Sequence, residues 1–497
     1  MILAFFLLVF DPRYHTHAAV LRELDSLTRS NPSIMHLDTI GLTTRDSLII
    51  PAVKISDHPQ QDEDEPAVLY VGNHHAEEIL GVEICMYMIR DLIVNYGTDS
   101  AKTYWVNNRE IWIVPMLNAE GHEVVLSEMD TIWRKNKRDN NQNGVFDLDY
   151  DGVDLNRNYD FHWTEGGSMD PASENYRGSA PFSENETRAI RDLARSENFV
   201  FAVSYHSART GIGEVLYYPW SDPSGYPPDI IFLRQVADSA SKRIVNDAGN
   251  GHYWAMIGLG LDGMARNWLY GVSGTFAFEI EVSKSCQPPG SKVDSICIRN
   301  LSGAYYLLSR VESGGITGHI IDTLTHQPIS AEVIVQGYYD PELPVRKSDP
   351  RFGRFIRILT PGIYTITVRK YGYEPKTVDS VKVEPEIMTD LIIFLNPMER
   401  ETDFITYPRI VIQPNPAGRS IVFNMGRGFE PMDLKIYDIN GRLIKSFQVY
   451  SRIEQLVNYI FVWDTFDDHG RRVPNGVYVA IGSTLSRKTS SKFVINE

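Results

Sequence analysis

Three short segments of the sequence carry side chains that can bind a metal ion and activate water. The first is Gly72–Glu78, in which a histidine precedes a glutamate by three residues, as in His75 and Glu78. It lies between an apolar run that predicts a strand and a periodic pattern that predicts a helix, so both side chains can face one point. Another histidine, His206, ends a second apolar strand pattern. Two imidazoles and one carboxylate are a zinc ligand set that leaves the fourth position open for water.

The third segment is Phe276–Glu281, whose alternating pattern predicts a strand. Alternation places Glu279 and Glu281 on the face opposite Phe278 and Ile280. Two carboxylates on a strand that is otherwise apolar are costly unless they have a function. All three segments follow or end predicted strands, and ligands of α/β sheets bind at the carboxyl ends of the strands.

The chain from Tyr14 to Val311 resembles the zinc carboxypeptidases of the carboxypeptidase A and T type. Five motifs carry the resemblance, in the family's order: His75-Ala76-Glu77-Glu78, Trp133-Arg134-Lys135-Asn136, Asp154-Leu155-Asn156-Arg157-Asn158, His206 and Glu281. The resemblance implies an α/β fold with a doubly covered mixed sheet, one zinc ion per chain, and release of C-terminal residues from peptides and proteins.

The resemblance also implies the metal ligands, which would be His75, Glu78 and His206. Carboxypeptidase A is itself the standard example of a site with two histidines and one glutamate. His74 and Glu77 have the same spacing, but the register with His75 and Glu78 also brings the residues that follow into the family's helix pattern. The sequence departs from the family at Glu77, where arginine is usual.

The remaining matched residues would act on the substrate. Glu281 would serve as general base toward the water and then as acid toward the leaving amine. Arg134 would stabilise the oxyanion of the tetrahedral intermediate. Asn156 and Arg157 would hold the terminal carboxylate of the substrate, a task that suits a planar guanidinium.

Two further departures from the family concern substrate specificity. The position of the family's substrate-covering tyrosine falls on Leu259, and Tyr253 or Tyr270 could replace that tyrosine unless it is absent. Arg266 falls where the family's pocket residue sets the side-chain preference, which would favour acidic C-terminal residues. Glu279 falls in the same pocket region and could pair with Arg266 and neutralise it.

A polar insertion between the second and third motifs resembles the first half of a calcium-binding loop of the EF-hand type. Oxygen-bearing side chains occur at alternate positions before a glycine and again after it, at Asp139, Asn141, Asn143 and Asp147. A calcium ion there would order the substrate-binding segment. The alternative is a polar surface loop.

Alternating strand and helix patterns predict one α/β domain over residues 11–312. The clearest strand patterns are Ala67–Val71, Ile111–Val114, Phe199–Tyr205 and Thr275–Val282, and the clearest helix pattern is Glu78–Ile93. Continuous apolar runs of this kind predict a sheet that is mostly parallel and covered on both faces.

The pattern changes near Ser313–Gly315 to short strands and turns, which predict two all-β sandwich domains. Residues 316–397 resemble the transthyretin-like β-sandwich that often follows this peptidase domain. After a polar linker at Glu399–Asp403, residues 405–497 resemble the immunoglobulin-like C-terminal modules of secreted bacterial proteins, including secretion-sorting tails. The strand patterns are Ile316–Ile321, Ala331–Val335, Ile363–Val368, Ile410–Ile412, Leu434–Tyr437 and Gly476–Ala480. The first resemblance rests on Ile316–Asp322, Gln327–Ile329 and Pro361–Tyr364, and the second rests on the turn Pro414–Pro416, Ile436–Arg442, Trp463–Asp464 and Val473–Tyr478. These modules imply an extracellular or cell-surface location, a bacterial source, and the cell surface or secretion machinery as partner.

Bulk properties limit the partners and the compartment. A net charge of −16 argues against nucleic acid. The apolar segment Met1–Phe10 resembles the centre of a secretion signal, with a buried strand as the alternative, and no other run predicts a transmembrane helix. Three cysteines are too few for a disulfide scaffold: Cys286 and Cys297 could pair, or all three, with Cys85, are buried thiols.

Two other functions remain open at this level. A deacylase would keep the fold and the metal but cleave a non-peptide amide, against which the Asn156–Arg157 pair counts. A cell-surface binding protein with an inactive site is favoured by Glu77 and Leu259. The presence of all three ligands together with Glu281 counts against inactivity.

Overall fold

The structure is a computed structural model of the whole chain. The residues it describes are 10–207, 212–223, 225–260, 262–338, 340, 343–398, 410–413, 415, 421–428, 432–449, 457–468, 470–483 and 488–496. Apart from Phe10 and Asn415, the predicted signal segment, the 399–403 linker and the 414–416 turn lie outside these residues. The chain forms two compact units, Met1–Arg369 with Pro375–Leu395, and Lys370–Glu374 with Asn396–Glu497.

An eight-stranded mixed sheet forms the centre of the first unit, with the strand order β1-β2-β4-β3-β5-β8-β6-β7. Its strands are β1 (Met35–Leu42), β2 (Ile49–Ile55), β3 (Ala67–Gly72), β4 (Glu110–Val114), β5 (Phe199–His206), β6 (Val215–Ser221), β7 (Trp254–Leu259) and β8 (Phe276–Glu281). The central strands β4, β3, β5 and β8 run parallel, as the apolar runs predict, whereas β1 with β2, β2 with β4, and β6 with β8 pair antiparallel.

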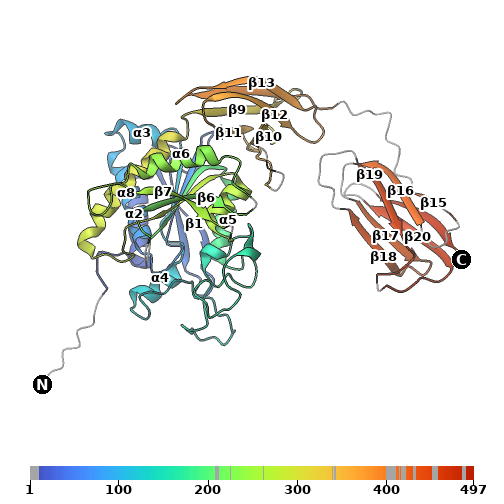
Figure 1. Cartoon of the computed structure of the whole chain (residues 1–497), viewed down its shortest axis with the longest axis horizontal. Coiled ribbons are helices and arrows are strands. Elements are labelled where there is room, and N and C mark those ends of the chain that lie inside the picture. Colours follow the sequence, from blue (N-terminus) through green and yellow to red (C-terminus); the bar gives the residue numbers. More distant parts are fainter. Residues whose placement is uncertain are drawn as a thin grey trace. The chain divides into compact units, whose positions relative to one another are not determined.

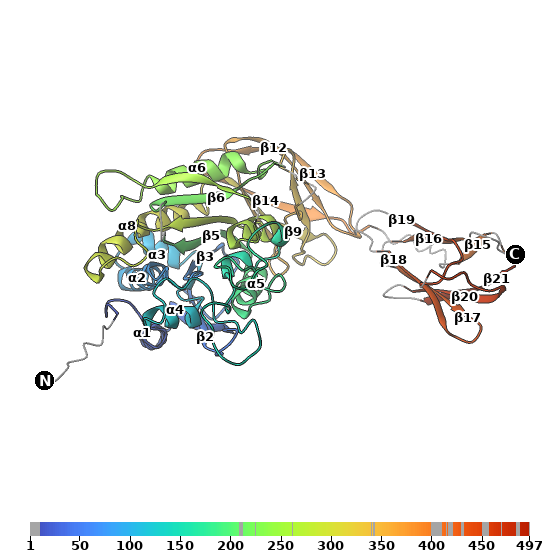
Figure 2. The same ribbon diagram turned by 60° about the horizontal axis from the view of Figure 1, so that its bottom comes forward.

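Helices cover both faces of this sheet. They are α1 (His17–Ser30), α2 (Leu80–Asn95), α3 (Ser100–Val106), α4 (Ala119–Leu126), α5 (Asn185–Ser196), α6 (Ile230–Ser241), α7 (Ala265–Trp268) and α8 (Gly290–Arg310), with short turns η1 (Leu155–Arg157), η2 (Trp163–Glu165) and η3 (Leu269–Ser273). Helices α2 and α8 pack together on one side, and α5 lies on the other (Figures 1 and 2). The helix α2 is enclosed by both the sheet and α8. Its own apolar residues therefore occur all around the helix rather than along one stripe.

Within the described residues, the remaining strands form four smaller sheets. In the first unit, β9 (Gly315–Asp322), β11 (Arg354–Ile358) and β14 (Met388–Leu395) form one sheet, and β10 (Glu332–Val335), β12 (Gly362–Arg369) and β13 (Lys376–Val383) form another. In the second unit, β15 (Val411–Gln413), β16 (Ile421–Gly428) and β19 (Val457–Trp463) form a sheet, as do β17 (Met432–Asp438), β18 (Leu443–Val449), β20 (Gly476–Ser483) and β21 (Lys488–Ile495).

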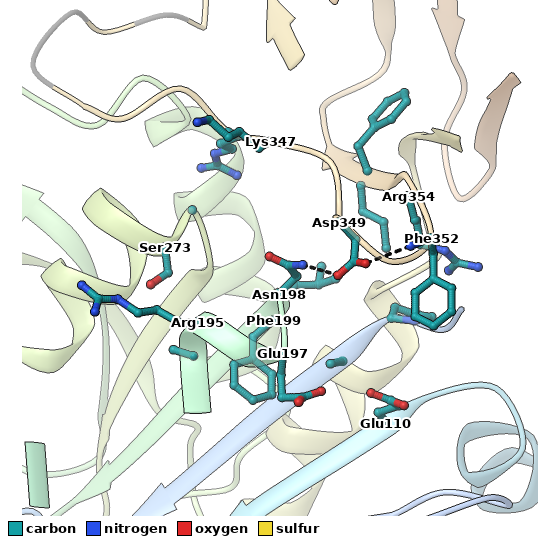
Figure 3. A pocket seen from close by; sticks show the side chains of 18 of the residues that line it. Glu110, Arg195, Glu197, Asn198, Phe199, Ser273, Lys347, Asp349, Phe352 and Arg354 are labelled. Carbon is teal, nitrogen blue, oxygen red and sulfur yellow. Dashed lines mark hydrogen bonds between the residues drawn. The ribbon is translucent and has the colours of Figure 1, made fainter. Parts of the chain in front are cut away.

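The strands that follow α8 in the first unit, β9 to β14, are called the β9–β14 segment. This segment packs against the amino ends of the central strands. A pocket of about 360 Å³ lies at this junction, lined by the first residues of four strands, Ala67, Glu110, Phe199 and Phe276. Figure 3 shows the carboxylates of Glu110 and Glu197 at its floor. The chemistry-bearing segments follow the opposite, carboxyl ends of the strands, so this pocket is remote from them.

The three cysteines form no disulfide. Cys85 and Cys297 are buried and Cys286 is half-buried, and none of the three is joined to another by a disulfide. The pairing of Cys286 with Cys297 is therefore not formed. Within the described ranges, the helices are too short or too polar to span a membrane.

A charge cluster attaches the chain before α1 to α2. The buried carboxylate of Glu83 accepts hydrogen bonds from Arg13 Nη1 at 2.9 Å and from His15 Nδ1 at 2.8 Å. His15 Nε2 lies 3.1 Å from a carboxylate oxygen of Glu23. Burial lowers the pKa of His15, but the hydrogen bonds to Glu23 and Glu83 outweigh it and raise the pKa to about 9.

We expect His15 to stabilise the fold in a pH-dependent way. Because its pKa is higher in the folded than in the unfolded chain, its contribution is complete below pH 6.5 and is lost as the pH rises through about 9. The difference in unfolding free energy between the wild type and His15→Asn should therefore shrink over that interval. Denaturant titrations at pH 6 and pH 9.5 measure it, and equal differences at both pH values would contradict the expectation.

Candidate functional site

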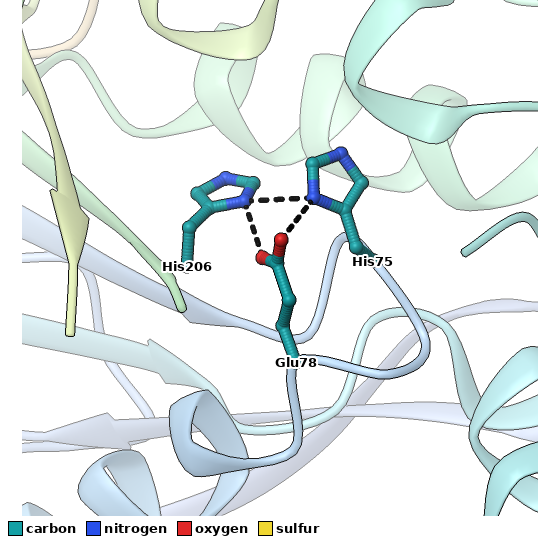
Figure 4. Close-up of side chains that lie close together, drawn as sticks. All are labelled: His75, Glu78 and His206. Carbon is teal, nitrogen blue, oxygen red and sulfur yellow. Dashed lines mark hydrogen bonds and ion pairs between the residues drawn. The ribbon is translucent and has the colours of Figure 1, made fainter. Parts of the chain in front are cut away.

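Three of the predicted residues converge on one point. His75 Nδ1 lies 2.9 Å from Glu78 Oε1, and His206 Nδ1 lies 2.8 Å from Glu78 Oε2 and 3.1 Å from His75 Nδ1. Figure 4 shows the three side chains pointing toward one another. All three are at least 96% buried. Burial raises the pKa of the Glu78 carboxyl, but the two imidazoles outweigh it and lower the pKa below its usual range.

The strand-to-helix connection after β3 positions two of these residues. Gly72 ends β3 so close to α2 that a Cβ atom on it would lie 2.6 Å from the carbonyl oxygen of Gly81. Only glycine permits this approach, which folds the His75–Glu78 segment over the carboxyl ends of β3 and β5. His206 is the last residue of β5, which is the parallel neighbour of β3. Segments more than 120 residues apart are thereby brought together.

The cluster fits a zinc ion. Its separations of 2.8–3.1 Å are close to the roughly 3.3 Å edge of a tetrahedron with metal bonds of about 2.0 Å. Both imidazoles present Nδ1, so a neutral ring offers a lone pair at each. Among the described residues, His75, Glu78 and His206 form the only such group of three in which every member is buried.

The other register does not form a ligand pair. Both nitrogens of the His74 ring contact neutral hydroxyls, Nδ1 to Ser204 Oγ at 2.9 Å and Nε2 to the Tyr159 hydroxyl at 3.0 Å. Glu77 is 1% exposed, and its Oε2 has no hydrogen-bond partner among the described residues. Burial and the neighbouring Glu78 raise the pKa of Glu77 to about 8.

Arg134 reaches the cluster from the side. Its Nε donates to Asp154 Oδ2 at 2.9 Å, and its Nη1 lies 3.1 Å from His75 Nδ1. Asp154 Oδ1 lies 3.3 Å from His75 Nε2, the nitrogen on the far side of that ring. Burial raises the pKa of the Asp154 carboxyl, but Arg134 and His75 outweigh it and hold the pKa well below its usual value. Asp154 therefore orients both the arginine and the imidazole.

Glu281 lies beside the cluster at the end of β8. In the parallel pairing of β5 with β8, it stands directly opposite His206. Its buried Oε2 has no hydrogen-bond partner in the described part of the chain. Burial, with repulsion from the carboxylates of Glu78 and Glu279, raises the pKa of Glu281 well above its usual value.

Asn156, Arg157 and Arg266, three of the residues predicted to bind substrate, are linked to Glu279 of β8 directly or through Asn156. Asn156 Nδ2 donates to Glu279 Oε2 at 3.2 Å, and Arg157 Nη1 donates to the Asn156 carbonyl at 2.8 Å. Arg266 is 3% exposed, and its Nη1 lies 3.5 Å from Glu279 Oε1. Burial raises the pKa of Glu279, but Arg266 and then His206 outweigh it and lower the pKa to about 2. Arg266 thus has a buried charged partner in Glu279.

Comparison with known proteins identifies the family. A family model described as zinc carboxypeptidase matches residues 20–302, more than half of the chain. The chain belongs to the zinc carboxypeptidase family. The carboxypeptidase N catalytic chain of Mus musculus is 27% identical over 404 residues, which cover 75% of this chain and 84% of that relative. Carboxypeptidase A2 of Mus musculus is 28% identical over 274 residues, which cover 54% of this chain and 62% of that relative.

Solved structures of the family support the fold. The crystal structure of thrombin activatable fibrinolysis inhibitor covers 60% of this chain and 74% of its own, with a TM-score of 0.52 at 23% identity. The carboxypeptidase A from Helicoverpa armigera covers 59% and 72%, with a TM-score of 0.53 at 21% identity. Family membership makes the chain a metallocarboxypeptidase and implies zinc as its metal.

The expectation that Tyr270 binds substrate is wrong. Tyr270 is 2% exposed and donates its hydroxyl proton to Asp229 Oδ2 at 2.8 Å. Tyr253 is also 2% exposed, and its hydroxyl accepts a hydrogen bond from the Ser283 amide. Both hydroxyls hold the fold together, whereas Leu259, at the family's tyrosine position, is 75% exposed.

The predicted calcium loop is closed by its own hydrogen bonds. Asp139 accepts from the amides of Asn143 and Gly144, at 3.2 and 2.8 Å. Asp147 Oδ2 accepts from the side-chain amides of Asn141 and Asn143, at 3.1 and 2.9 Å. The structure therefore brings all four predicted side chains together around one loop.

Proposed function

We propose that the chain is a zinc-dependent exopeptidase that removes single residues from the C-termini of peptides and proteins. The observation that carries this proposal is the convergence of His75, Glu78 and His206 beside Glu281. His75, Glu78 and His206 would hold a zinc ion, which would supply polarisation of the scissile carbonyl and a lowered pKa of water.

The chain's own residues divide the rest of the work. Glu281 takes a proton from the attacking water and delivers it to the leaving amine. Arg134, held by Asp154, donates to the carbonyl oxygen as it becomes negative. Asn156 and Arg157 bind the terminal carboxylate of the substrate, which restricts cleavage to the last peptide bond.

The test is zinc content by mass spectrometry, combined with the release of C-terminal residues from a peptide library. We expect one zinc per chain and stepwise release. His75→Ala should lose the metal, and His74→Ala should retain it at measurable affinity. Zinc without release, or zinc loss confined to His74→Ala, would overturn the assignment.

We propose that Arg266 and Glu279 together set the preference for the C-terminal side chain. Glu279 neutralises Arg266 in the wild type, which weakens any preference for acidic residues. Glu279→Gln keeps the shape and the acceptor for Asn156 but frees the charge of Arg266. It should raise kcat/KM for substrates ending in Glu, relative to Phe, by about tenfold. An unchanged or smaller ratio would show that Arg266 does not face the substrate.

We propose that the loop from Asp139 to Asp147 binds calcium, because oxygen-rich side chains at this spacing suit a hard cation. Isothermal titration of the chelator-stripped protein should show saturable calcium binding, and Asp139→Ala should abolish it. A titration without binding heat would end the proposal.

We propose three domains, an α/β domain at residues 11–312 and two β-sandwich domains at residues 316–397 and 405–497. The mouse carboxypeptidase N alignment supports the second, because it covers more of this chain than residues 20–302 can supply. By resemblance, the third domain attaches the enzyme to the surface of a bacterial cell or directs its export. Proteolysis of intact cells that releases the activity would support this location.

A further inference from the structure

A series of buried hydrogen bonds begins at Nε2 of His206, the ring nitrogen opposite the Nδ1 atom that faces Glu78. His206 Nε2 lies 3.0 Å from Ser204 Oγ, which lies 2.9 Å from His74 Nδ1. His74 Nε2 then lies 3.0 Å from the hydroxyl oxygen of Tyr159. All four residues are at most 5% exposed, so water does not compete for these contacts.

Three separate parts of the fold position the residues of this hydrogen-bond series. Ser204 and His206 lie on one face of β5, because side chains two apart point the same way. His74 comes from the turn between β3 and α2. Tyr159 follows the η1 turn, where its amide donates to the Gly263 carbonyl at 3.0 Å. Glu279 Oε2 lies 3.9 Å from His206 Nε2, too far for a hydrogen bond, so Ser204 is the partner of that nitrogen.

We propose that Ser204, His74 and Tyr159 are positioning residues that fix the tautomer of His206 and thereby its affinity for zinc. A neutral imidazole carries one N–H, and the other nitrogen offers a lone pair. His206 can present a lone pair at Nδ1 when its proton is on Nε2, which then donates to Ser204 Oγ. The single proton of Ser204 is thereby directed to His74 Nδ1. The proton of His74 is then on Nε2 and is donated to Tyr159.

The opposite proton order is incompatible with the metal. Tyr159 would donate to His74 Nε2, His74 Nδ1 would donate to Ser204, and Ser204 would donate to His206 Nε2. The proton of His206 would then be on Nδ1, where it blocks the ligand lone pair. The hydroxyl oxygen of Tyr159 keeps the first order available, because it is the acceptor for His74 Nε2–H.

We therefore expect Tyr159→Phe to shift the balance between the two proton orders toward the one that blocks the lone pair on His206 Nδ1. Without the oxygen, a proton on His74 Nε2 is buried without an acceptor, which favours the tautomer with the proton on Nδ1. That tautomer donates to Ser204 and promotes the order that blocks His206. A single atom, two residues removed from the nearest ligand in the hydrogen-bond chain, should thus control metal binding.

The inference rests on the proposed zinc site, and the experiment separates the two. Zinc dissociation constants are measured by competition with a chelating indicator for full-length wild type, Tyr159→Phe and Ser204→Ala. Both variants should bind zinc about 10- to 100-fold more weakly, the usual effect of removing a partner of a metal-binding histidine. The cobalt-substituted variants should also show an altered visible spectrum.

Two controls make the result specific. Ser207→Ala removes a buried hydroxyl next to His206 that has no partner among the described residues, and it should leave zinc affinity unchanged. His74→Asn keeps an acceptor near Nδ1 and should bind zinc more tightly than His74→Leu. If the wild type binds no zinc, the metal site itself is wrong. If the wild type binds and Tyr159→Phe binds within twofold of it, the site stands and the positioning role is overturned.

Discussion

Replacing Glu281 with Gln should leave zinc content at one per chain and lower kcat/KM for peptide hydrolysis by about 10²- to 10⁴-fold. Glutamine keeps the size of the side chain but cannot accept the proton of water. Zinc should remain, because the cluster of converging ligand atoms comprises His75, Glu78 and His206 without Glu281. The carboxylate faces the cluster from β8, opposite His206 in the strand pairing, which is the geometry that a base for a metal-activated water needs.

Zinc stoichiometry and the release of the terminal amino acid should be measured on the same preparation. Loss of zinc together with activity would assign Glu281 to the metal rather than to proton transfer. Activity above one tenth of the wild type would exclude it as general base. A wild type that binds zinc and peptides without hydrolysis would favour the inactive binding protein instead.

The convergence of His75, Glu78 and His206 could be predicted from the sequence because its signals are local. His75 and Glu78 share one strand-to-helix turn, and His206 and Glu281 end predicted strands. Alternation along β5 also places Ser204 beside His206, so that partner could be found from the sequence. His74 and Tyr159 could not, because their contact joins segments 85 residues apart. Asp154 lies inside a recognised motif, but its position between Arg134 and His75 depends on the folded loop.

Tyr270 illustrates why the sequence does not identify a substrate-covering tyrosine. Its position near the matched segment says nothing of its partner, Asp229, which lies 41 residues earlier. The change in pattern near Ser313 predicts where β structure begins, and β9 starts at Gly315. The contacts of that β structure with the sheet involve charged side chains from distant loops, which no periodic pattern specifies.

Replacing Asp229 with Ala should destabilise the first unit by about 3–5 kcal/mol, since it leaves buried charge without a partner. Asp229 is 1% exposed and accepts from Tyr270 and from Arg346 Nη2 at 2.9 Å. Arg357 of β11 is 4% exposed, and its Nη2 lies 3.5 Å from Asp229 Oδ1. Burial and the neighbouring Arg346 lower the pKa of Arg357 to about 10, so this guanidinium depends on the carboxylate.

The matched control is Asp62→Ala at the same junction. Asp62 pairs with Arg351, but their side chains are 45% and 37% exposed. The second partner of Asp62, the buried Lys54 at 3.4 Å, keeps the carboxylate of Glu110 at 2.6 Å, so losing Asp62 should cost at most about 1 kcal/mol. Urea unfolding followed by tryptophan fluorescence compares the two, because seven of the eight tryptophans lie in the first unit. A large effect of Asp229→Ala alone would show that burial, and not ion-pair formation, decides how firmly the β9–β14 segment is held. Equal effects would mean that Arg357 finds another partner or water once the carboxylate is gone.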